Sequence, residues 1–140
     1  AATSHSDRIP RRPLRELLPH ADVITLHCPL TPQTHHLIGA EQLSQMKPSA
    51  LLINVSRGGL VDEQALLAAL KSGQIAGAGI DVLTEEPPVS GNPLLSEQLP
   101  NLLVTPHCAW GSREARQRLV DEMALNIQAF LSGTARNRLV

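Results

Sequence analysis

Aromatic side chains are almost absent from this sequence of 140 residues. Trp110 and Phe130 are the only two, and there is no tyrosine. Proteins that bind single-stranded nucleic acid stack bases on aromatic rings, so this composition excludes a base-stacking platform. A basic surplus is missing too, because the formal net charge is -1. We therefore expect no nucleic-acid partner.

Cysteine and long hydrophobic runs are also scarce. Cys28 and Cys108 are too few to form a disulfide scaffold, and they favour reduced thiols inside the cell. The longest aliphatic run covers residues 50–53, whereas a membrane-spanning helix needs about 20 apolar residues. The first five residues are neither basic nor apolar enough for a signal peptide. Together these absences predict a cytoplasmic protein that does not bind membranes.

Four short apolar runs organise the chain. They cover residues 22–26, 50–54, 77–82 and 102–105, so they begin 28, 27 and 25 residues apart. Continuous runs of this length are typical of strands that are covered on both faces, as in a parallel sheet. The long segment 84–100 holds several prolines without periodicity, which predicts a loop.

Helical patterns separate the runs and follow the last one. Asp62 is a candidate N-cap for a helix over 63–71, with Gly73 as its stop, and a weaker pattern covers 40–46. The alternation predicts an α/β fold built from βαβ units. A long C-terminal helix is predicted between Ser112 and Gly133. Apolar residues recur along it every three or four positions and predict a core-facing stripe: Ala115, Leu119, Met123, Ile127 and Phe130.

Reactive side chains gather where the runs end. Arg57 follows the second run, Asp81 lies near the end of the third with Glu86 soon after, and His107 follows the fourth. The carboxyl ends of parallel strands meet at one edge of a sheet, where open α/β sheets bind their ligands. We therefore expect these side chains to converge on one crevice.

The residue types suit one chemistry. The guanidinium of Arg57 can pair bidentately with a carboxylate. The imidazole of His107 can give or take a proton, and the carboxylate of Glu86 can orient it. Reduction of a 2-keto acid requires such an anchor, proton carrier and partner, but its electrons must come from a cofactor.

A metal site is the alternative use of these residues. His27 and Cys28 follow one run, and His107 and Cys108 follow another, and both residue types bind zinc. Adjacent residues of an extended chain point to opposite faces, so each pair offers one ligand. Since no C-x-x-C or H-x-x-x-H spacing supports the site, we expect no metal.

Several motifs, in order, resemble the D-isomer-specific 2-hydroxyacid dehydrogenase family. They are HCPLT at 27–31, MKP at 46–48, INVSRGGLVD at 53–62, GIDV at 79–82, EP at 86–87 and TPH at 105–107. The resemblance extends from about residue 14 to residue 133. Within the family, the segments EPP, NPLL and PHCAW are most similar to the glycerate dehydrogenase (hydroxypyruvate reductase) branch.

The resemblance implies an activity and a role for each site residue. The activity is hydride transfer between NAD(P)H and a small 2-keto acid or D-2-hydroxy acid, with hydroxypyruvate or glyoxylate to D-glycerate or glycolate favoured. Arg57 would bind the substrate carboxylate and polarise the keto oxygen, and His107 would be the acid–base residue with Glu86 as its partner. Asp81 would hold the nicotinamide amide. The residues implied to bind NAD or NADP are Cys28, Pro29, Val55, Ser56, Arg57, Asp81, His107 and Cys108.

One part of the family pattern is missing. The only G-x-G, at 77–79, lies inside an apolar run and does not open a helix, so the G-x-G-x-x-G fingerprint is absent. The resemblance therefore predicts a C-terminal fragment. Residues 1–111 would be part of a doubly wound, Rossmann-type domain, and 112–140 a helix that returns to a substrate domain. Taken as strands 3 to 6 of the order 3-2-1-4-5-6, the runs predict three paired strands and an unpaired first strand.

Two alternatives to a working enzyme stay open. The family includes NAD(H)-sensing corepressors of the C-terminal-binding-protein type, which keep the same catalytic residues. A chain without the phosphate-binding loop would also bind cofactor weakly and be inactive by itself. The resemblance further implies a homodimer for the full-length protein.

Overall fold

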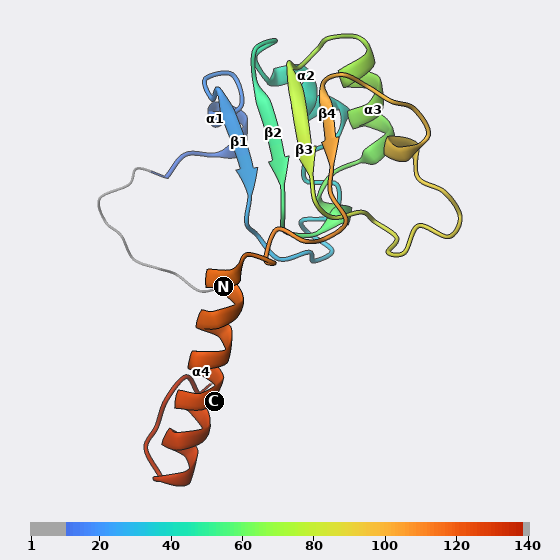
Figure 1. Ribbon diagram of the computed structural model, residues 1–140. Helices are drawn as coiled ribbons and strands as arrows, with labels where there is room; N and C mark the ends of the chain where they lie inside the picture. The colour runs from blue at the N-terminus through green and yellow to red at the C-terminus, as the bar shows by residue number, and fades with distance from the viewer. Residues whose placement is uncertain (1–10, 139–140) are drawn as a thin grey trace. The chain divides into compact units, whose positions relative to one another are not determined.

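The computed structural model describes residues 11–138 and divides into two compact units, one ending at Pro106 and one beginning at His107. The first unit alternates short strands with helices (Figure 1). Its strands are β1 (Val23–Leu26), β2 (Leu51–Asn54), β3 (Gly77–Ile80) and β4 (Leu102–Val104). Its helices are α1 (Leu14–Leu17), α2 (Ala40–Gln45) and α3 (Glu63–Lys71), with 3₁₀ turns η1 (Gly58–Leu60) and η2 (Pro93–Leu95). Each predicted run therefore contains one strand.

The strands form a parallel sheet in the order β1-β2-β3-β4, which confirms the predicted α/β fold. The prediction of an unpaired first strand is wrong, because Val23–Leu26 pairs residue by residue with Leu51–Asn54. In a doubly wound sheet, strands that are neighbours both in sequence and in space lie on one side of the switch point. The four runs occupy one such side, so no missing strand separates the first from the second.

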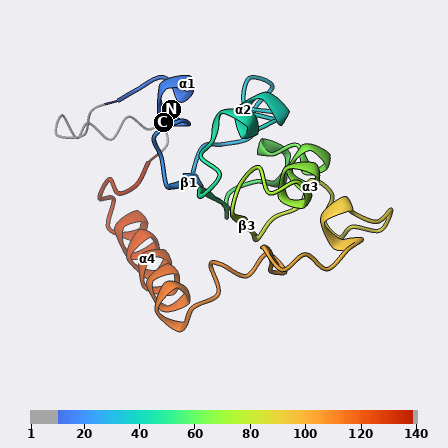
Figure 2. The same cartoon turned by 90° about the horizontal axis from the view of Figure 1, so that it is seen from above.

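Helices α2 and α3 cover one face of this sheet (Figure 2). Ile24 and Leu52 point to that face and are 5% and 0% exposed, whereas Val23 and Leu51 are 55% and 41% exposed. The expectation of cover on both faces is therefore wrong for this chain. Right-handed crossovers that progress in one direction along a sheet place their helices on the same face. Within residues 11–106, side chains on the second face, such as Leu103, stay exposed.

Helix α3 begins and ends as its sequence predicts. The Asp62 carboxylate accepts a hydrogen bond from the Ala65 amide at 3.0 Å, and Gly73 follows the helix with φ +70°. Leu66 and Leu70 are buried and belong to the hydrophobic core between the helices and the sheet. Local capping and an apolar stripe therefore fix the helix that follows the Arg57 turn.

The second unit contains α4 (Arg113–Leu131), the predicted long helix, which is capped by Ser112. The prediction that its apolar stripe faces a core is wrong for this unit, because Met123, Ile127 and Phe130 are 55%, 59% and 81% exposed. One helix offers no second layer against which its stripe could be buried. Within residues 11–138, no helix is long and apolar enough to cross a membrane.

The two faces of the sheet should differ in their contribution to stability. We expect Leu52→Ala to lower the free energy of unfolding of the 140-residue chain by about 2–5 kcal/mol, because it opens a cavity in the core. The neighbouring Leu51→Ala should cost at most about 1 kcal/mol, because that side chain is 41% exposed. Urea unfolding followed by circular dichroism measures both values. Equal losses would contradict the one-sided sheet.

Candidate functional site

The carboxyl ends of the parallel strands lie at one edge of the sheet, as the sequence predicts. The turns that follow β1, β2 and β3 carry most of the predicted site residues. These are Cys28 and Pro29 after β1, Val55, Ser56 and Arg57 after β2, and Asp81 and Glu86 after β3. His107 and Cys108 begin the second unit.

A buried amide shapes the turn that carries Arg57. Asn54, the last residue of β2, is 1% exposed; its Oδ1 accepts from the Ser56 amide at 3.1 Å and its Nδ2 donates to the Arg57 carbonyl at 2.9 Å. The Ser56 hydroxyl donates to the Cys28 carbonyl at 2.9 Å and so joins this turn to the end of β1. The Arg57 side chain is exposed and donates to the Ser56 carbonyl at 2.7 Å. Asn54 was not among the predicted site residues, although an amide side chain three residues before the candidate anchor was the available signal.

Asp81 lies at the end of β3 and is 3% exposed. Its carboxylate accepts a hydrogen bond from the Thr105 hydroxyl, and its amide donates to the Asn54 carbonyl at 2.9 Å. These contacts tie the ends of β2 and β3 to the residue that follows β4. Asp81 therefore holds the edge together, and its contact with a cofactor stays a prediction.

The turn after Arg57 packs directly against the loop that leads to Glu86. A Cβ at Gly58 would lie 2.0 Å from the Leu83 carbonyl carbon and 2.3 Å from the Thr84 nitrogen, so no larger residue fits. The Leu83 amide in turn donates to the Glu86 carboxylate at 2.7 Å. Gly58 therefore leaves room for the Leu83–Thr84 peptide. Arg57 and Glu86 thus lie on two segments in contact.

His107 and its neighbours open the second unit. His107 is exposed and has φ +52°, a left-handed conformation that non-glycine residues adopt rarely and that is found at functional sites. Its carbonyl accepts a hydrogen bond from the Trp110 indole at 2.9 Å. Trp110 is 61% exposed. Cys108 is exposed and forms no disulfide.

These turns suit one part of a dinucleotide and not another. Backbone amides and carbonyls at the ends of β1 and β2, together with the Asp81 carboxylate, match the hydroxyl and amide groups of a nicotinamide riboside. A pyrophosphate needs a glycine-rich helix N-terminus. Helix α3 instead begins with Asp62 and Glu63, whose negative charges repel phosphate. The turns therefore offer polar groups of the kind that a nicotinamide riboside binds, and the start of α3 offers no site for a pyrophosphate.

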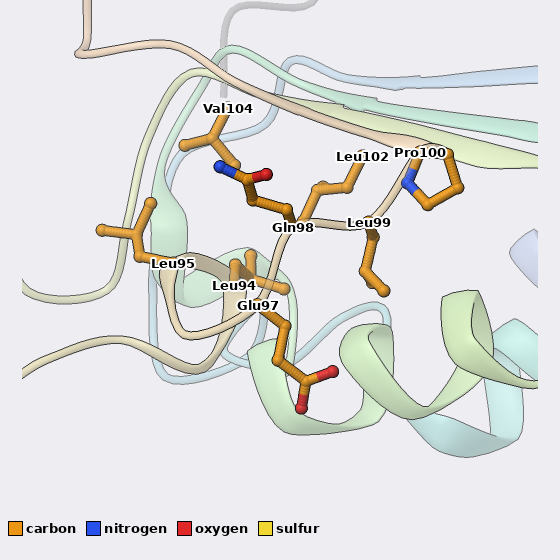
Figure 3. Close-up of a pocket in the computed structure, with 8 residues that line it drawn as sticks. All are labelled: Leu94, Leu95, Glu97, Gln98, Leu99, Pro100, Leu102 and Val104. Carbon is orange, nitrogen blue, oxygen red and sulfur yellow. The ribbon is translucent and has the colours of Figure 1, made fainter.

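A cavity of about 600 Å³ lies apart from these turns, between the η2 segment and β4 (Figure 3). Four leucines and one proline form most of its wall, and none of the predicted site residues lines it. The eight residues drawn in Figure 3 include no lysine or arginine, so the cavity offers no cation to a carboxylate or phosphate. Among residues 11–138, no three His, Cys, Asp or Glu side chains cluster closely enough to hold a metal ion.

The parallel sheet and its carboxyl-edge turns define a Rossmann-type nucleotide-binding domain. The chain belongs to the D-isomer specific 2-hydroxyacid dehydrogenase family, and residues 2–109 match the NAD binding domain of that family.

Three similar proteins illustrate the relationship. A glycerate dehydrogenase of Methylorubrum extorquens is 59% identical over 124 residues, which cover 89% of this chain and 40% of that protein. The NAD-complexed D-isomer specific 2-hydroxyacid dehydrogenase of Lactobacillus delbrueckii ssp. bulgaricus is 34% identical, with a TM-score of 0.75 over 88% of this chain and 40% of that one. An acyclic imino acid reductase in complex with NADPH and D-Arg is 40% identical, with a TM-score of 0.80 over 92% of this chain and 40% of that one. The chain therefore spans less than half the length of these proteins.

The buried Asn54 amide should be essential to the Arg57 turn. Asn54→Asp keeps the acceptor for the Ser56 amide but places an oxygen against the Arg57 carbonyl, where the amide donated. We expect the free energy of unfolding to fall by about 1–3 kcal/mol at neutral pH. Urea titration measures it, with the exposed Asn137→Asp as a matched control that should change little. Equal effects of both substitutions would show that the amide does not support the turn.

Proposed function

We propose that the chain is part of an NAD(P)-dependent dehydrogenase that interconverts a small 2-keto acid and its D-2-hydroxy acid. Hydroxypyruvate or glyoxylate, reduced to D-glycerate or glycolate, is the favoured substrate. The observation that carries the proposal is the contact of Gly58 with the Leu83–Thr84 peptide, because it joins the Arg57 turn to the Glu86 loop. The family membership and the glycerate dehydrogenase relative support the same chemistry.

In this proposal Arg57 anchors the substrate. Its exposed guanidinium pairs with the substrate carboxylate and polarises the keto oxygen, and the Asn54 hydrogen bonds fix the backbone from which it extends. A planar fork suits both oxygens of a carboxylate, which favours 2-keto acids over simple aldehydes and ketones.

Proton transfer belongs to His107 and Glu86. Protonated His107 donates its proton to the keto oxygen as the keto carbon is reduced, and Glu86 orients the imidazole and stabilises its charge. NAD(P)H, when bound, supplies the hydride. Asp81 would accept from the nicotinamide amide, and the backbones of Val55, Ser56 and Arg57 and of His107 and Cys108 would line its ribose. Cys28 and Pro29 would border the adenosine side.

The proposal extends to the organisation of the complete protein. Residues 1–111 would belong to the nucleotide-binding domain, and 112–140 would return towards a substrate domain. The exposed apolar stripe of α4 supports this arrangement, because Met123, Ile127 and Phe130 need a partner layer to be buried. A homodimer and a cytoplasmic location complete the proposal and rest on the family and the composition.

Turnover by the complete protein tests the proposal first. We expect NADH or NADPH to support reduction of hydroxypyruvate and glyoxylate faster than that of pyruvate or phosphohydroxypyruvate, and no oxidation of formate. Absorbance at 340 nm follows each reaction. NADH binding without turnover of any 2-keto acid would contradict the proposal and favour the NAD(H)-sensing alternative. The same assay on the 140-residue chain tests whether it is inactive alone.

Side-chain substitutions separate the two catalytic roles. In the complete protein, His107→Gln should lower kcat by about 10²–10⁴-fold and leave the affinity for NADH near the wild-type value, since only the proton carrier is lost. Arg57→Lys keeps the charge but not the bidentate fork, so we expect kcat/KM for the 2-keto acid to fall roughly 10- to 100-fold. Steady-state kinetics and fluorescence titration with NADH measure both. Wild-type turnover by either variant would refute that residue's role.

A further inference from the structure

The carboxylate of Glu63, the first residue of α3, joins the two ends of the loop that carries Glu86. Its Oε1 accepts a hydrogen bond from the Thr84 amide at 2.8 Å, and its Oε2 accepts one from Asn92 Nδ2 at 2.8 Å. Thr84 and Asn92 bound the part of the loop that carries Glu86, which we call the 84–92 segment. One carboxylate therefore closes this segment on itself and fixes it to the start of a helix.

The Asn92 end of the segment is anchored in the core. Asn92 is 9% exposed, and its Oδ1 accepts from the Leu94 amide at 2.9 Å, which caps η2. Leu94 is 2% exposed and belongs to the hydrophobic core. The side-chain amide of Asn92 is therefore a fixed donor to Glu63. Because this donor is anchored in the core, it holds the Glu63 carboxylate in one position.

The Thr84 end is held on two sides. The Leu83–Thr84 peptide packs against Gly58, where a Cβ would lie about 2 Å from it, and Glu63 binds its N–H. The Leu83 amide, one residue earlier, donates to the Glu86 carboxylate at 2.7 Å. A shift of this peptide would therefore move the hydrogen bond that orients Glu86.

An acidic residue in the first turn of a helix also has an ordinary role, because it interacts favourably with the helix dipole. That role needs a negative charge at the position and no particular contact. It does not explain why both Glu63 oxygens bind donors from another segment. Glu63→Asp separates the two, since it keeps the charge but is too short to reach both donors.

We propose that Glu63, with Asn92, is a positioning residue for the acid–base pair: it clamps the 84–92 segment so that the Leu83 amide holds the Glu86 carboxylate in place. The inference rests on the proposed function, in which Glu86 is the partner of His107. Glu63 touches neither substrate nor cofactor in this proposal and acts only through Glu86.

Hydrogen exchange in the 140-residue chain tests the clamp without any activity. Glu63→Gln has one oxygen and one amino group, so it satisfies one of the two donors and opposes the other. The segment is then held at one end only, so it opens more often and the Thr84 amide should exchange roughly 10- to 100-fold faster. Glu63→Asp should show the same effect. Glu97→Gln is a matched control, because it removes an exposed ion pair between Lys71 of α3 and the segment after η2. Its Thr84 exchange should stay at the wild-type rate.

Exchanging the two groups should restore the clamp. In the double variant Glu63→Gln/Asn92→Asp, the new amide at 63 donates to the new carboxylate at 92 and still accepts from Thr84. The other oxygen at 92 keeps its bond to the Leu94 amide. We expect Thr84 exchange to return most of the way to the wild-type rate. Wild-type exchange in Glu63→Gln, or a double variant as fast as either single one, would overturn the clamp.

Kinetics of the complete enzyme test the positioning role. Glu63→Gln should lower kcat roughly 10- to 100-fold and leave the KM for NADH unchanged. In a Glu86→Gln background it should cause no further loss, because it acts through Glu86. Equal losses in both backgrounds would overturn the positioning role. If the wild type reduced no 2-keto acid, or if Glu86→Gln had normal turnover, the proposed function would be wrong, and so would the positioning role of Glu63. The hydrogen-exchange results test the clamp independently of that function.

Discussion

The missing Cβ of Gly58 is the constraint on which the candidate site depends. Without it, the turn after β2 approaches the Leu83–Thr84 peptide so closely that any side chain would collide with backbone. Backbone cannot move aside as the end of a flexible side chain can. The contact therefore fixes the distance between the segment of Arg57 and the segment of Glu86, and the hydrogen bonds of Asn54 and Glu63 hold the two segments on either side of it.

The parallel sheet places these turns at one edge, and its one-sided cover has a separate consequence. Both described crossover helices, α2 and α3, lie on the same face, so the core forms there and includes Leu52, Leu66 and Ile80. Leu51 and Leu103 face the other way and are exposed. Within the described first unit, the edge that carries the candidate site is therefore supported by a core on one side only. The chain covers 40% of its glycerate dehydrogenase relative.

Much of the fold could be predicted because its signals are local. The apolar runs predicted the four strands. Asp62 and Ser112 predicted the starts of α3 and α4, because each caps an amide only three residues further along the chain. The motif that contains Arg57 and the family resemblance pointed to the carboxyl edge. The pairing of β1 was predicted wrongly, since a run of four residues does not encode which strand lies beside it. The exposure of the α4 stripe was missed for the same reason, because periodicity shows what a helix can bury and not what it meets.

The sequence by itself determined the four strands, helices α2 to α4, the caps of α3 and α4, and the family, because each of these follows from patterns within a few residues. Tertiary structure decided which face stays open and which polar groups meet across long separations. Glu63 binds partners 21 and 29 residues away, and Gly58 contacts a peptide of another crossover. Such contacts depend on where successive crossovers bring the backbone, and that position is set by the packing of the whole unit.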